Sequence, residues 1–527
     1  EGPGSRLPTR GNWSAPVLAN LTGDGKLSIL TASFDGHLYA FQPNGKAVPG
    51  WPVEVKLPAA MANDIPAGKY IRDPKLIQAP AVGDVLGTGK DQVFLPSFEC
   101  NDQTGEVFLY GIQSEGNNHP GGAYMPGWPT KSLGMAGCYQ ESIDFVQEGG
   151  NSPTLADVDG SGKLRIAFTP AGGFPQIMNA DGSVYKQMSA QCPTDTCQGI
   201  PPYYLQDALV IGLTGQAAFG DLAGDGKLSY VQSVAGGTSL LQAFDADGTA
   251  LLAHVYDAAW DPVTGKPLPA FPTDQDGFAF YSSPLITGLS TGKTRSMISS
   301  NDSYWIHARG PDGKEAPGFP KWTGQWTSFG GVVGDPKLDG KQYLAYGTRE
   351  GELFLWKVGG DPNRNDQWWH YRHDEHNSGR FGNDTRPPAG AKVKVKRTKK
   401  RALLTWKAVG DNGVSNGKVR RIEVYRSKKP ISIGKLKKAS RIKAPKIANP
   451  KKLQRVKIKL AKKKKAFIAI RSRDAAGNWS SLTTVTVKKF NTRALIKKKV
   501  KKCKKKFKKN KKKRAKCIKR GKKAARR

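Results

Sequence analysis

The amino-acid sequence predicts an all-β protein, and three features of its 527 residues indicate this fold class. One phrase with a Gly/Asp loop recurs six times within the first 382 residues. Asn-Gly and Asp-Gly dipeptides, which favour tight hairpins, separate short apolar runs in the same region. Apolar and polar residues then alternate with period two for about 100 residues, as in half-buried strands.

Charge and composition divide the chain into parts. Residues 386–527 hold 56 Lys and Arg against three acidic residues, a charge of +53, so residues 1–385 carry −13 of the net +40. We expect an acidic domain in residues 1–382, a Pro-containing linker in 383–390, a second domain in 391–490 and a basic tail in 491–527. No stretch approaches the roughly 18 apolar residues of a membrane-spanning helix, so the sequence predicts none within these residues.

The repeated phrase predicts the architecture of the acidic domain. Its copies fall at positions 16, 80, 153, 217, 284 and about 332, a mean step of about 63 residues. Each step reads as four short strands, and such sheets repeated around an axis form a β-propeller. Six blades are recognisable, and we expect a seventh in the complete ring because residues 1–10 look like the end of an earlier repeat. Pro-Gly-aromatic-Pro segments, such as 49–52, are expected to leave the sheet and cross to the next repeat.

The phrase, with Pro, an apolar run and Asp-x-[Asp/Asn]-Gly-Asp-Gly-Lys, resembles the FG-GAP or VCBS repeat of secreted bacterial propeller proteins over roughly residues 10–382. The resemblance implies loops that often bind calcium. The candidate ligands are Asp157, Asp159, Ser161 and Lys163 in the third copy, Asn20, Thr22 and Asp24 in the first, and Asp221 and Asp225 in the fourth. With at most two carboxylates per loop, calcium would bind weakly and structurally. Alternatively, these Asp and Gly residues only form turns.

Three of the seven histidines crowd into one segment, WWHYRHDEHNSGRF, as His370, His373 and His376. Three imidazoles at this spacing could bind Zn²⁺ or another transition metal. The segment also resembles the closing segment found where related propellers end, which packs as a clasp. We favour the clasp, since a motif without its structural context is only a hypothesis.

The second domain is predicted to be a small antiparallel β-sandwich. Trp406, Tyr425 and the ending RDAAGNWS resemble a bacterial fibronectin type III module, in which Trp406 would be a core residue. Phe467 stands where many such modules carry Tyr. A module of this kind is more often a spacer than an active domain.

The tail is predicted to be disordered because 21 of its last 31 residues are Lys or Arg and none is acidic. It should bind polyanions, including anionic cell-wall polymers, membrane surfaces and, without selectivity, nucleic acid. The alternative is a solubilising tail without a dedicated partner. The candidate polyanion-binding residues are Lys501, Lys502, Lys504, Lys505, Lys506, Lys508, Lys509, Lys511, Lys512, Lys513 and Arg514.

Six cysteines are compatible with disulfides in an oxidising compartment. The alternative is free thiols in loops. The candidate disulfide residues are Cys192 with Cys197, Cys100 with Cys138, and Cys503 with Cys517.

These features favour an extracellular, cell-envelope-associated binding or adhesion protein that is not an enzyme. The sequence contains no His-Glu-x-x-His motif and no phosphate-binding Gly-x-x-x-x-Gly-Lys-Ser/Thr motif. The propeller would recognise a protein or carbohydrate ligand, the latter by stacking on exposed Trp or Tyr. One alternative is the accessory region of a secreted polysaccharide lyase or peptidase whose catalytic domain lies upstream of Glu1. A second is nucleic-acid binding through the tail.

Overall fold

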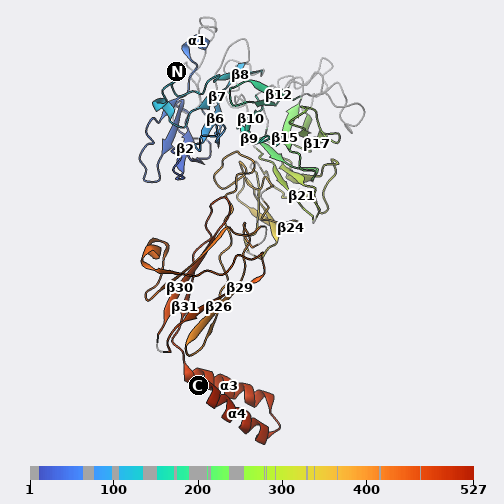
Figure 1. Cartoon of the computed structure of the whole chain (residues 1–527). Coiled ribbons are helices and arrows are strands. Elements are labelled where there is room, and N and C mark those ends of the chain that lie inside the picture. The colour runs from blue at the N-terminus through green and yellow to red at the C-terminus, as the bar shows by residue number, and fades with distance from the viewer. Residues whose placement is uncertain are drawn as a thin grey trace. The chain divides into compact units, whose positions relative to one another are not determined.

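A computed structural model of the chain contains two compact units, residues 1–337 with 341–385 and residues 386–527 with 338–340 (Figure 1). The residues that the structure describes are 11–12, 14–62, 76, 78–97, 106–133, 151–170, 175–188, 210–211, 215–236, 254–277, 279, 282–290, 292–327, 330–337, 339–364, 366–414, 417–462 and 464–526.

Six antiparallel sheets form the first unit, in agreement with the predicted propeller blades. The first comprises β1 (Val17–Ala19), β2 (Ser28–Ala32), β3 (His37–Phe41) and β4 (Val53–Glu54), and the second comprises β5 (Ala81–Gly83), β6 (Gln92–Pro96), β7 (Glu106–Ile112) and β8 (Thr130–Leu133). The third comprises β9 (Thr154–Ala156), β10 (Arg165–Phe168), β11 (Gln176–Met178) and β12 (Val184–Gln187), and the fourth comprises β13 (Val210–Ile211), β14 (Ala217–Gly220), β15 (Ser229–Gly236), β16 (His254–Trp260) and β17 (Thr273–Asp274). The fifth comprises β18 (Leu285–Thr287), β19 (Ser296–Ser300), β20 (Trp305–Arg309) and β21 (Lys321–Trp322), and the sixth comprises β22 (Val332–Gly334), β23 (Gln342–Gly347) and β24 (Leu353–Val358).

The sheets follow one another around an axis. Successive contacts join β1 to β5, β5 to β9, β9 to β14, β14 to β18 and β18 to β22. β5, β9, β14 and β18 are buried along their whole length, because neighbouring blades cover both of their faces. The described residues give six blades; residues 1–10, on which the prediction of a seventh rests, lie outside them.

The Pro-Gly-aromatic-Pro segments do not cross to the next repeat as predicted. Each leads directly into the outermost strand of its own sheet, and the aromatic–Pro peptide bond is cis in all four. The tryptophan in two of them instead links neighbouring blades. Trp51 Nε1 donates to the carbonyl of Ser114 at 3.3 Å, and Trp128 Nε1 donates to that of Ala180 at 2.8 Å. The two tryptophan-containing segments therefore join blades through a side chain, while their backbone continues into the outermost strand of its own sheet.

The first full strand of each blade that contacts the neighbouring blades, β1, β5, β9, β14, β18 and β22, is called its inner strand. Residues 368–381, which we call the closing segment, bind five of these six inner strands through backbone hydrogen bonds. The carbonyls of His376, Ser378 and Gly379 accept from Leu18 of β1, Val82 of β5 and Leu155 of β9. The carbonyls of Trp368 and Trp369 accept from Ile286 of β18 and Val333 of β22. The predicted clasp is therefore the arrangement that the structure contains.

Two buried charges hold the closing segment in shape. Arg372 donates to the carbonyls of Ser152 and Pro80, and burial lowers the pKa of its guanidinium to about 10. Burial alone would raise the pKa of Asp374, but hydrogen bonds from His373, Ser378 and Asn383 lower it to about 2. Asp374 thus stays ionised in the interior and fixes the turn that follows His373.

The second unit contains the predicted β-sandwich. A three-stranded sheet has the order β25-β26-β29, and a four-stranded sheet has the order β28-β27-β30-β31. Their bounds are β25 (Lys394–Arg397), β26 (Arg401–Lys407), β27 (Arg421–Ser427), β28 (Ser440–Ile442), β29 (Leu453–Lys459), β30 (Ala466–Arg473) and β31 (Thr483–Val487). Trp406 lies in the core between the two sheets, as predicted. Phe467 packs in a smaller cluster with Ile431 and Leu436.

Helices are few in the described residues. The short ones are α1 (Ala59–Ala62), η1 (Gly116–Asn118) and η2 (Ile433–Lys438). Two longer helices, α3 (Thr492–Lys506) and α4 (Lys511–Arg526), end the chain. None of the helices in the described part of the chain is long and apolar enough to cross a membrane.

Replacing Asp374 by Asn should destabilise the first unit by about 3 kcal/mol, because breaking a buried charged network leaves its partners unpaired. The folded pKa of Asp374 lies below the value of about 3.9 expected for an unfolded Asp. Its ionisation therefore stabilises the fold above about pH 4, and this stabilisation is lost as the pH falls toward 2. Urea unfolding at several pH values measures both effects.

The matched control is D312N, at an exposed turn, which should change the unfolding free energy by less than about 0.5 kcal/mol. If D374N and D312N unfold alike, Asp374 does not hold the closing segment.

Candidate functional site

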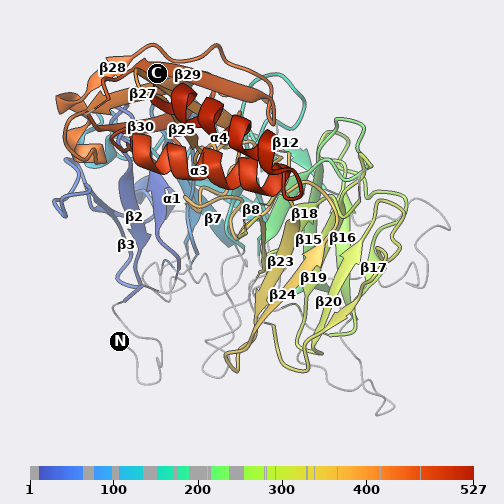
Figure 2. The ribbon, with the colours of Figure 1, turned by 90° about the horizontal axis from the view of Figure 1, so that it is seen from below.

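The basic end of the chain forms a helical hairpin, in which α3 and α4 lie side by side (Figure 2). Asparagine caps the start of each helix. The side chain of Asn491 accepts from the N–H of Ala494 at 2.9 Å, and that of Asn510 accepts from the N–H of Lys513 at 2.8 Å. A disulfide between Cys503 and Cys517 joins the two helices, as predicted.

The prediction of a disordered tail was wrong for Thr492–Arg526. Lys, Arg and Ala are good helix formers, although like charges one turn apart repel each other. Closing a loop of about 15 residues with a disulfide removes roughly 3 kcal/mol of unfolded-state entropy. The covalent link therefore offsets part of the repulsion on which the prediction of disorder was based.

The sequence contains a signal for this hairpin that the charge count concealed. Ile496, Val500, Cys503 and Phe507 follow one another at steps of four, three and four residues, and these side chains are less exposed than all the lysines between them except Lys499. Such spacing places them along one face of a helix. A pattern search that allowed for very few apolar residues would have found α3.

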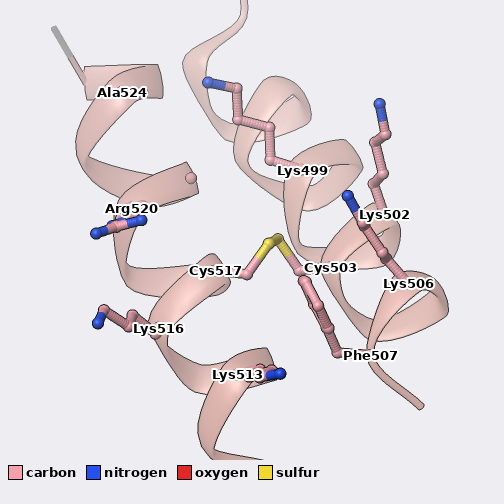
Figure 3. Close-up of a pocket in the computed structure, with 11 residues that line it drawn as sticks. Lys499, Lys502, Cys503, Lys506, Phe507, Lys513, Lys516, Cys517, Arg520 and Ala524 are labelled. Carbon is pink, nitrogen blue, oxygen red and sulfur yellow. A yellow bond between two sulfur atoms is a disulfide. The ribbon is translucent and has the colours of Figure 1, made fainter. Parts of the chain in front are cut away.

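The cations line an open groove beside the disulfide (Figure 3). Lys499, Lys502 and Lys506 reach it from α3, and Lys513, Lys516 and Arg520 reach it from α4. Phe507 and Ala524 supply apolar atoms. No acidic residue belongs to the hairpin, so the groove has a positive potential that attracts anions. When a polyanion binds such a surface, its condensed counterions are released.

The predicted polyanion-binding residues divide between three parts of the hairpin. Lys501, Lys502, Lys504, Lys505 and Lys506 lie on α3, Lys508 and Lys509 in the turn, and Lys511, Lys512, Lys513 and Arg514 on α4. Three of them, Lys502, Lys506 and Lys513, line the groove. The prediction omitted Lys499, Lys516 and Arg520, because only the pairing of the helices brings these residues to it. The other disulfide candidates, Cys100, Cys138, Cys192 and Cys197, lie outside the described residues.

The proposed calcium loop of the third blade is closed by its own hydrogen bonds. Asp157 accepts from the N–H of Gly162, and Asp159 accepts from the N–H of Ser161. Arg165 also donates to Asp159 at 2.8 Å, which lowers the pKa of that carboxyl well below its usual range. Lys163 is exposed at the end of the loop. Arg165 thus neutralises one of the two carboxylates that the loop could offer to calcium.

The first and fourth loops are closed in the same way. Asn20 and Asp221 each accept from the N–H five residues later, at Gly25 and Gly226. Asp24 accepts from both Thr22 and Lys26, and the bond from Lys26 is the main reason why the pKa of Asp24 lies far below its usual range. Asp225 accepts from the N–H of Lys227. The hydrogen bonds of the three loops are those of turn formation, and calcium binding stays a prediction.

The three clustered histidines do not converge on one point. His373 is buried, with Nδ1 donating to Asp374 at 3.0 Å and Nε2 accepting from the N–H of Gly382 at 3.3 Å. His370 bonds through Nδ1 to the carbonyl of Tyr371, and the carbonyl of His376 is bound to β1. The residues covered by the structure contain no group of three His, Cys, Asp or Glu side chains able to hold a metal ion.

Comparisons with known proteins give distant matches to propeller structures. No family model and no curated protein matches the chain. It matches the Dos1 propeller at 11% identity, over 72% of each chain, with a TM-score of 0.35. It matches the biofilm matrix protein Bap1 of V. cholerae at 13% identity, over 78% of this chain and 73% of that one, with a TM-score of 0.25. The exotype rhamnogalacturonan lyase YesX matches at 14% identity, over 72% and 61%, with a TM-score of 0.33. Matches this weak carry no argument about function.

Calcium at about 10 mM, well above the range of weak extracellular sites, should leave the melting temperature of the protein unchanged. The reason is that Arg165 already neutralises Asp159. Differential scanning calorimetry with CaCl₂ measures this, and MgCl₂ at equal ionic strength is the control. A rise specific to calcium would restore the calcium interpretation.

Replacing both Cys503 and Cys517 by Ser should unfold the hairpin, because the loop-closure contribution of roughly 3 kcal/mol is lost while every cation is kept. Hydrogen–deuterium exchange should then show loss of protection in residues 492–526 and unchanged protection in β26 and β30. Retained protection in the double variant would show that the apolar face alone orders the helices.

Proposed function

We propose that the chain is an extracellular, non-enzymatic binding protein associated with the cell envelope, which its basic end anchors to anionic polymers. The hairpin carries this proposal. Residues 492–526 hold 21 Lys and Arg, 19 of them on two helices that a disulfide joins, and no acidic side chain. Near an anionic surface, each such residue contributes about 1 kcal/mol.

The disulfide also supports the proposed location. Structural disulfides form and persist in secreted and cell-surface proteins and are rare in the cytosol. Cys503 is buried and Cys517 is half-buried, so part of the bridge is shielded from solvent.

The propeller would act as the recognition platform and the sandwich as a spacer. We assign the blades to the FG-GAP or VCBS type, which the Asp-Gly loops support through their shared closing bond to the residue five positions later. The seven strands of the sandwich, divided three to four, support the fibronectin type III-like assignment.

Deleting residues 497–527 should weaken binding to isolated cell-wall polymer by more than tenfold at about 0.15 M salt, since some 20 counterion-releasing charges are removed. Co-sedimentation measures the binding. The melting temperature of the first unit is the control and should not change. Full retention after the deletion would place the anchor elsewhere.

Competition between duplex DNA and wall polymer at fixed salt separates the anchor from the nucleic-acid alternative. Equal or better competition by the wall polymer is expected. Displacement by DNA at far lower charge concentration would favour nucleic acid as the partner.

A further inference from the structure

A second cationic surface lies on the β-sandwich, separate from the hairpin. It is the outer face of the sheet β25-β26-β29. The strand register places Lys394, Thr405 and Arg455 side by side across the three strands. Lys396, Leu403 and Lys457 lie next to them in the same way. Directly paired residues lie on the same face of a sheet, and so do residues two apart in one strand.

Seven exposed cations share this face with three neutral side chains, Leu403, Thr405 and the exposed Leu453, which is paired with Lys407. The cations are Lys394 and Lys396 of β25, Arg401 and Lys407 of β26, and Arg455, Lys457 and Lys459 of β29. Leu403 and Thr405 form the half-buried floor between them. The opposite face, with Ala402, Leu404 and Trp406, is buried in the core, which fixes the outward direction of the cations. We call this surface the trough.

None of the three acidic residues of the sandwich pairs with the cations of the trough. Each of them has other partners. Glu423 pairs with Arg421, Arg441 and Arg471 on the other sheet. Asp474 is buried and accepts from Gly477 and Asn478, and Asp411 accepts from the N–H of Ala475. Among the residues described, none of the seven cations forms an ion pair with a carboxylate.

This arrangement costs stability. Arg401 lies directly opposite Lys459, and like charges in such cross-strand pairs are destabilising. Acidic residues opposite these cations would relieve the repulsion, yet the three strands of this sheet contain no Asp or Glu. Departures from local stability rules concentrate where a surface has a function.

The spacing of the trough fits one extended chain. Residues two apart on β29 are about 7 Å apart, and β25 and β29 lie about 10 Å apart on either side of β26. One row of cations thus lies along β25 and a second row along β29. Between them, Leu403 and Thr405 of β26 form a neutral floor as wide as a single strand. A flat anionic membrane would favour cations spread over the middle of the face, where Leu403 and Thr405 lie instead.

We propose that the trough binds one extended polyanion, which lies along β26 and directs its anionic groups alternately to the two rows. The inference rests on the proposed binding of anionic polymers and specifies a linear chain as the ligand. The trough and the hairpin are then two sites for the same class of polymer.

Lysine footprinting of the full chain tests this proposal, with poly-L-glutamate of 20 residues as the probe. At about ten times the dissociation constant, mass action leaves roughly a tenth of the sites free, so acetylation of Lys394, Lys396, Lys457 and Lys459 should slow about tenfold. Lys428, Lys429 and Lys443, which are exposed outside the trough, are internal controls and should change less than about twofold under the same mass action.

Two variants of equal charge refine the test. R455Q/K457Q/K459Q removes one row and should abolish the protection of Lys394 and Lys396. K428Q/K429Q/K443Q removes the same charge and should preserve it.

The outcomes separate the two proposals. Protection of the hairpin lysines without the trough lysines would overturn this inference and leave the anchor standing, whereas no protection anywhere would overturn both. Protection of the trough by phosphatidylglycerol vesicles and not by poly-L-glutamate would also overturn it, because the ligand would be a membrane surface. Loss of protection in both variants would show that net charge alone is responsible.

Discussion

The closing segment is the constraint on which the first unit depends. Its carbonyls bind inner strands that lie more than 300 residues apart in the sequence, from β1 to β22. Each such bond contributes only about 1 kcal/mol, but together they fix the inner edges of five blades against one short backbone. This requires a backbone that turns sharply, and Arg372, His373 and Asn377 all have positive φ. Asp374 pins that turn by accepting from the N–H of His376 and from Ser378.

Arg372 shows what this arrangement costs. Its guanidinium is buried and faces two carbonyl groups, not a carboxylate. Removing a charge from water is expensive unless it is well paired. The desolvation cost is offset because the same side chain binds the residues that precede β5 and β9 and so joins them to the closing segment. The residue therefore serves connectivity between blades more than stability in its own right.

The sequence allowed the blades to be predicted because turn chemistry is local. Gly45, Gly182 and Gly313 adopt positive φ in the predicted hairpin turns, as Asn-Gly and Asp-Gly pairs require. The path after Pro52 could not be predicted, since it depends on the neighbouring blade to which Trp51 donates. Order in the tail was missed for a related reason. Charge density is visible in the sequence, whereas the pairing of Cys503 with Cys517 becomes decisive only once both helices exist.

The two units handle charge in opposite ways, and this contrast supports a division of labour. In the acidic propeller, carboxylates are neutralised within their own loops, as Asp24 is by Lys26 and Asp159 by Arg165. In the second unit, the few carboxylates accept hydrogen bonds or form ion pairs away from the trough, and the seven trough cations form no ion pair with a carboxylate of the described residues. Under the proposed binding of anionic polymers, cations on both a rigid sheet and a hairpin would engage one polymer at two places. Because the two proposed sites belong to one chain, the second contact would form at high effective concentration, so two weak sites would together give strong attachment.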